Sequence, residues 1–151
     1  MESLFNKADN QKIIDRINAL SASSKPKWGK MNVEQMLAHA GQPMLAAYGE
    51  TKMSKRGLIS LLFGKIAKKQ LITENKPFKQ NLPTDQSFII ANPENIEKEK
   101  QELIRSVKQF AEKGPDAITK AQHSFFGNLT AAEWDKLQWK HLDHHLRQFG
   151  V

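Results

Sequence analysis

The sequence predicts an all-α fold, a four-helix bundle with a long crossover between helices two and three. Four stretches of about 12 to 20 residues repeat apolar side chains at the three- and four-residue spacing of an amphipathic helix. No stretch shows a convincing alternation of apolar and polar residues, which would indicate a strand. The chain has 151 residues and no internal repeat, so we expect a single domain over residues 1–151.

The first two helices are predicted from their apolar faces and their end signals. The first carries apolar residues about one turn apart: Ile13, Ile14, Ile17 and Leu20. The polar stretch 21–26, which contains a proline, then ends it. The second helix should begin after Asn32, because an Asn N-cap followed three residues later by Gln35 forms a capping box. Its apolar face extends to Tyr48.

The third and fourth helices are also predicted from their ends. Residues 92–94, Asn-Pro-Glu, have the types expected of an N-cap, a first-turn proline and a first-turn acid, so the third helix should begin there. The Gly-Pro pair at 114–115 should end it. Thr130 and Glu133 form a second capping box, which places the fourth helix at about residues 131–148.

The crossover, residues 49–93, has weak helical signals, and we expect only one or two short helical pieces in it. It also carries the net charge of +7, because residues 51–80 contain eight Lys or Arg and a single acid, Glu74, whereas the rest of the chain is neutral. We expect a solvated, mobile loop whose apolar residues are buried. These residues are Leu58, Ile59, Leu61, Leu62 and Phe63.

Composition excludes several classes of protein. The chain has no cysteine, which excludes disulfides, thiolate metal sites, iron–sulfur clusters and a cysteine nucleophile. It has no run of 18 apolar residues, and its first residues lack the charged start and apolar run of a leader peptide. We therefore expect a soluble cytoplasmic protein with no membrane span.

Three of the five histidines lie within residues 141–145, on the predicted fourth helix. At about 100° per residue, His141 and His145 lie about 40° apart in the middle of the apolar face, and His144 lies at its edge. Each buried polar group without a partner costs roughly 1–3 kcal/mol, and a shared metal ion would satisfy both rings. Two histidines four residues apart on a helix also have the spacing of helical zinc sites. The alternative is that each ring hydrogen-bonds a neighbour.

Two ligands from one helix rarely complete a metal site, so a third should come from a facing helix. His39 is the candidate, although the helical wheel places it at the border of the apolar face of helix two. Pro43 cannot donate a hydrogen bond to the His39 carbonyl, and the resulting bend could turn His39 inward or could be unrelated to it. His123 is expected to be a loop or core histidine bonded to the backbone.

Three neutral imidazoles would leave at least one position of a divalent ion open. Such an ion could lower the pKa of a bound water or activate a bound thiol. Three side chains lie near the predicted site on helical geometry, and none of them stands out as a general base: Glu34, Gln35 and Gln148. The sequence therefore predicts no catalytic side chain.

Two segments, WGKMNVEQMLAHA at 28–40 and HSFFGNLTAAEWDKLQWKHLDHHLRQFG at 123–150, resemble the DinB-like superfamily of metal-binding four-helix bundles, in a branch known as a domain of unknown function. The resemblance spans helices two to four. It implies that His39, His141 and His145 bind a divalent ion, usually zinc or nickel, and that His144 has a supporting or structural role. Some relatives transfer low-molecular-weight thiols onto electrophiles.

The first functional hypothesis is a metal-dependent enzyme, a thiol transferase or hydrolase acting on a small electrophile. One alternative is a non-catalytic bundle whose metal only stabilises the fold. Another is a binding module in which the basic 51–80 segment docks on an acidic partner or a membrane surface. Nucleic acid is disfavoured, because no nucleic-acid motif or aromatic stacking array occurs. A homodimer remains open.

Overall fold

The computed structural model describes residues 2–151 and confirms the all-helical fold. Its α-helices are α1 (Lys7–Asn18), α2 (Val33–Ala47), α3 (Leu58–Lys68), α4 (Ile96–Lys113) and α5 (Ala131–Gln148). A π-helical turn, η1 (Lys69–Thr73), follows α3, and two 3-10 turns are η2 (Gln86–Phe88) and η3 (Pro115–Ala117). Residues 2–151 contain no strand.

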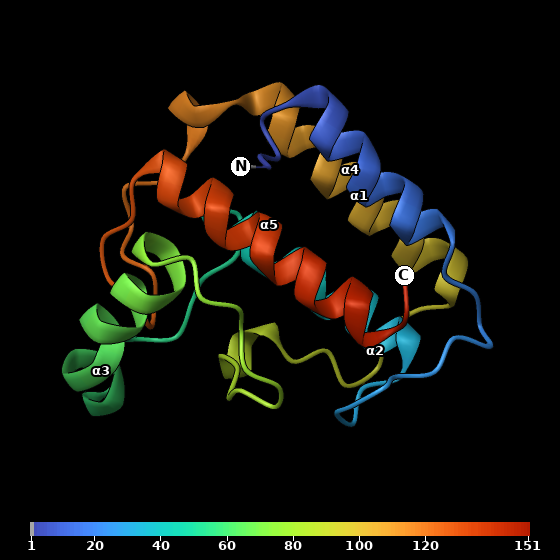
Figure 1. Cartoon of the computed structure of the whole chain (residues 1–151), viewed down its shortest axis with the longest axis horizontal. Coiled ribbons are helices and arrows are strands. Elements are labelled where there is room, and N and C mark those ends of the chain that lie inside the picture. Colours follow the sequence, from blue (N-terminus) through green and yellow to red (C-terminus); the bar gives the residue numbers. More distant parts are fainter. Residues whose placement is uncertain (1) are drawn as a thin grey trace.

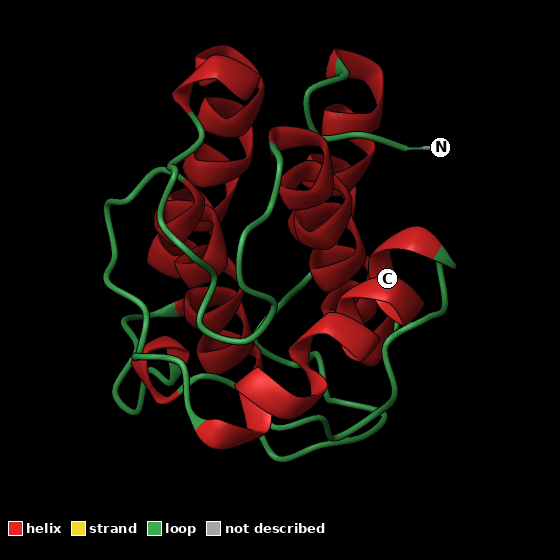
Figure 2. Ribbon diagram, turned by 90° about the vertical axis from the view of Figure 1, so that its left-hand side faces the viewer, coloured by secondary structure: helices red, strands yellow, loops and turns green. Residues whose placement is uncertain are grey.

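The bundle consists of α1, α2, α4 and α5. Both α1 and α2 pack against α4 and α5. Figure 1 shows α1 beside α4, α5 in front of α2, and α3 set apart from them near the start of α5. Figure 2, turned by 90°, shows the long helices standing side by side. The core between them contains fully buried apolar side chains, among them Ile13, Ile17, Met36, Met44, Leu103, Phe110, Trp134 and Leu146.

The helix ends test the predicted capping signals. Both capping boxes are confirmed: the Asn32 side chain accepts from the Gln35 amide at 2.8 Å, and Thr130 accepts from the Glu133 amide at 3.2 Å. The predicted start of the third helix is wrong by one turn. Asn95 caps α4 by accepting from the Lys98 amide at 3.1 Å. This start places two acids in the first turn of α4, where they interact favourably with the helix dipole.

The crossover contains the helical pieces that were expected, but its apolar residues are not buried. Each of the five named above is more than half exposed, and so is Ile66. The small side of α3, Ser60 and Gly64, faces the rest of the chain, so the large side chains point away from it. None of the helices in residues 2–151 has the length and apolar character needed to cross a membrane.

Candidate metal centre

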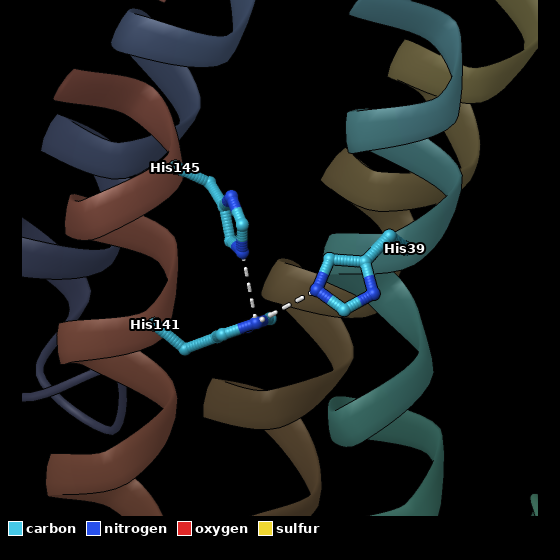
Figure 3. Close-up of side chains that lie close together, drawn as sticks. All are labelled: His39, His141 and His145. Carbon is cyan, nitrogen blue, oxygen red and sulfur yellow. Dashed lines mark hydrogen bonds between the residues drawn. The ribbon is translucent and has the colours of Figure 1, made fainter. Parts of the chain in front are cut away.

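Three histidines bring their Nε2 atoms together between two helices of the bundle (Figure 3). His141 Nε2 lies 3.1 Å from His39 Nε2 and 3.1 Å from His145 Nε2. His39 belongs to α2 and the other two to α5, so residues 102 positions apart in the sequence meet here. The structure therefore brings together the three histidines that the sequence singled out.

Two of the rings are held by hydrogen bonds at their other nitrogen. His39 Nδ1 donates to the carbonyl oxygen of Phe88 at 3.0 Å, and His145 Nδ1 donates to Gln148 Oε1 at 2.8 Å. The Gln148 amide is itself oriented, because its Nε2 donates to the carbonyl of Trp28 at 2.6 Å, an atom that can only accept. When the single ring proton of a neutral imidazole is on Nδ1, its Nε2 carries a free lone pair. These two hydrogen bonds therefore hold His39 and His145 in the tautomer whose Nε2 can bind a metal.

The converging nitrogens cannot all be satisfied by one another. The lone pairs of His39 and His145 both face His141 Nε2, which carries at most one proton to share between them. The Nδ1 atom of His141 is buried and has no hydrogen-bond partner among the described residues. A cation between the three Nε2 atoms would remove the conflict among their lone pairs.

Burial keeps the three rings neutral. Desolvation lowers the pKa of His39, and it lowers the pKa of His145 to about 3 with a smaller contribution from repulsion by His39. Desolvation, followed by repulsion from the other two rings, takes the pKa of His141 well below its ordinary value. Neutral imidazole is the protonation state that binds a metal. The 3.1 Å separations also approach the roughly 3.3 Å edge of a tetrahedral site with Zn–N bonds of about 2.0–2.1 Å.

The helical wheel placed His39 at the border of an apolar face, and the structure corrects this. His39 is only 3% exposed; η2 from the crossover packs on α2 here, and its Phe88 carbonyl accepts a hydrogen bond from the ring. The helix continues through Pro43 to Ala47 as one element. His39 is therefore buried against η2, a segment that is distant in the sequence and that a helical wheel of α2 does not include.

The remaining histidines lie outside the group. His144 is half-buried, and its ring packs between Trp28 and Phe78, with centroid distances of 5.5 and 5.8 Å. His123 is bonded to backbone as expected, since its Nδ1 accepts from the Phe125 amide at 3.0 Å. Burial lowers the pKa of His123 to about 4.

A cavity of about 380 Å³ lies along the outer side of α5, next to the histidine group. His144 lines this cavity, whereas the three converging histidines do not. Two residues that line the cavity also lie beside the site: the His144 ring centroid is 5.3 Å from that of His145, and the Phe78 ring centroid is 6.5 Å from that of His141. The cavity is mixed in character, with Trp28, Phe78 and Trp139 beside Lys136 and Arg147.

Sequence reasoning did not identify the groups that orient the ligands. Gln148 was noted only as a neighbour, and backbone carbonyls such as those of Phe88 and Trp28 have no sequence signal. One indirect signal is Gly29: its φ is +84°, and a Cβ there would lie 2.5 Å from Gln148 Nε2. Glu34 and Gln35 lie elsewhere, on a shallow surface beside residues 91–96.

Comparison of the sequence with models of known protein families identifies the family to which the chain belongs. The family model described as "Protein of unknown function (DUF1569)" matches residues 2–150. The chain belongs to the DUF1569 family. Neither the curated proteins nor the solved structures contain a match to it. Because the DUF1569 description carries no activity, the chemistry of this DUF1569 protein must be argued from its three histidines.

Proposed function

We propose that this DUF1569 protein binds a divalent metal ion, zinc or nickel, through the Nε2 atoms of His39, His141 and His145. The observation that carries the proposal is the convergence of these three atoms, with lone pairs fixed on two of them by Nδ1 hydrogen bonds. Three protein ligands leave a further position free, as in catalytic zinc sites, whereas structural sites are closed by four.

We further propose that the chain is a DinB-like bundle. Its long crossover between α2 and α4 and its histidine group, one from α2 and two from α5, agree with the sequence resemblance to that superfamily. This placement supports the same metal and the same three ligands.

The activity that we infer is a metal-dependent reaction of a thiol or water with a small electrophile, as in a thiol transferase or a hydrolase. The ion, when bound, supplies Lewis-acid activation of that nucleophile. The chain itself positions the imidazoles through Phe88 and Gln148 and keeps them neutral by burial. The basic 51–80 segment favours an anionic small molecule, such as a carboxylate-bearing thiol.

Elemental analysis after reconstitution with zinc or nickel tests the metal site. We expect about one ion per chain in the wild type and a loss of most of it in His39→Ala, His141→Ala and His145→Ala. His144→Ala is the matched control, because it removes an imidazole from the same helix and should keep most of the metal. Wild-type protein that stays metal-free with both ions would overturn the proposal.

Gln148→Leu tests the orienting contact. It keeps all three ligands but removes the acceptor of the His145 Nδ1 proton, so metal affinity should fall about 10- to 100-fold. Competition with a coloured chelator measures the affinity. Arg147→Leu, at an exposed neighbouring position, is the control and should bind as the wild type does. Equal affinities for the two variants would mean that the Gln148 contact does not contribute.

A further inference from the structure

The helix α3 presents its apolar side chains to solvent. Six of its eleven residues are large apolar residues that are 54–78% exposed, namely Leu58, Ile59, Leu61, Leu62, Phe63 and Ile66. A monomeric soluble protein rarely exposes a contiguous apolar patch of this kind unless the patch binds something. We call these six side chains the α3 apolar face.

The α3 apolar face is held outward by contacts on the opposite side of the helix. Ser60 Oγ donates to the carbonyl oxygen of Phe125 at 2.8 Å, and a Cβ at Gly64 would overlap that same oxygen. Lys68 Nζ donates to the Asn128 carbonyl at 2.8 Å and pairs with Glu133 at 2.9 Å. The helix is therefore fixed along its small side and cannot roll to bury its large side chains, and Figure 1 shows it apart from the bundle.

The charge around the α3 apolar face indicates what covers it. Residues 51–80 carry a net charge of +7, and Lys55, Lys65 and Lys69 are exposed beside the apolar side chains. In a two-fold symmetric dimer the same patch meets itself, so this face would oppose positive charge to positive charge. An anionic lipid surface is instead complementary, because it attracts the lysines and accepts the apolar side chains.

We propose that α3 is an interfacial helix that docks the protein on an anionic lipid bilayer. Leu58, Leu62 and Ile66 follow one another at four-residue spacing and enter the boundary between headgroups and acyl chains. Lys65 and Lys69 extend their apolar stems along the same boundary and place their ammonium groups at the lipid phosphates. The attachment is peripheral and does not depend on the metal ion.

Co-sedimentation with vesicles tests this proposal. The wild type should pellet with vesicles of phosphatidylcholine and phosphatidylglycerol in equal parts, and about tenfold less with phosphatidylcholine alone. Salt at about 0.5 M should weaken the binding, since it screens exposed charges. The double variants Leu62→Gln/Ile66→Gln and Lys65→Glu/Lys69→Glu should each lose affinity about tenfold or more.

The matched control for the charge variant is Lys7→Glu/Lys108→Glu, which changes the net charge equally at exposed positions of α1 and α4. It should bind the mixed vesicles nearly as the wild type does. Circular dichroism should confirm that every variant is folded, because all of the substituted side chains are exposed. The proposal is overturned if the wild type does not bind the mixed vesicles, or if the two α3 variants bind them as the wild type does. It is also overturned if sedimentation shows a dimer that Leu62→Gln/Ile66→Gln dissociates, while neither the wild type nor this variant binds vesicles.

Discussion

Zinc or nickel, at a free concentration about a thousandfold above the dissociation constant, should raise the free energy of unfolding of the wild-type protein by about 4 kcal/mol. The site exists only when α2 and α5 are packed together, because His39 comes from one helix and His141 and His145 from the other. An ion that binds this site therefore binds the folded state and not the unfolded chain. Urea unfolding at constant pH, with metal and with chelator, measures the difference.

The same measurement on His39→Ala isolates the contribution of the link between the helices. The variant retains only His141 and His145, which lie on one helix, so a metal bound to them no longer depends on α2 packing against α5. Most of the metal-induced stabilisation of about 4 kcal/mol should therefore disappear. His144→Ala should be stabilised by the metal nearly as much as the wild type. Equal stabilisation of His39→Ala and wild type would show that the ion binds elsewhere or binds without α2.

Phe110→Ala should lower the free energy of unfolding by about 3–5 kcal/mol, independently of metal. Phe110 is fully buried on α4, and its ring stacks on Phe5 with a centroid distance of 4.8 Å and meets Tyr48 edge-on at 5.5 Å. Truncation removes these contacts and leaves a cavity in the core beside Phe5 and Tyr48. Urea unfolding in the presence of chelator measures the loss.

Two controls calibrate the effect of the Phe110 variant. Tyr48→Phe removes only the hydrogen bond from the Tyr48 hydroxyl to the Phe110 carbonyl, so it should cost about 0.5–1.5 kcal/mol. Ile89→Ala changes an apolar side chain that is 50% exposed and should change stability by about 0.5 kcal/mol or less. A loss of less than about 1 kcal/mol for Phe110→Ala would contradict this account of the core.

The features that followed from the sequence are local ones. A capping box joins residues three apart, so the starts of α2 and α5 could be predicted. The His141 and His145 pair lies one turn apart on α5, and their approach depends only on helix geometry. The predicted start of α4 was wrong. Asn92 and Asn95 are both of a residue type that caps helices, and in the structure the N-cap is Asn95.

The remaining features depend on contacts between distant segments. His39 is buried where η2 of the crossover packs on α2 and the Phe88 carbonyl accepts a hydrogen bond from its ring. Gln148 is oriented by the carbonyl of Trp28, 120 residues away in the sequence. The outward direction of the α3 apolar face depends on a carbonyl in the loop before α5. Helix periodicity predicts which side chains of one helix share a face. Whether a side chain is buried depends also on which other segments pack against that face. The helices, the histidine pair and His39 as the candidate third ligand could therefore be predicted from the sequence. The tertiary structure alone determined the burial of His39, the contacts that orient the rings, and the exposed α3 apolar face.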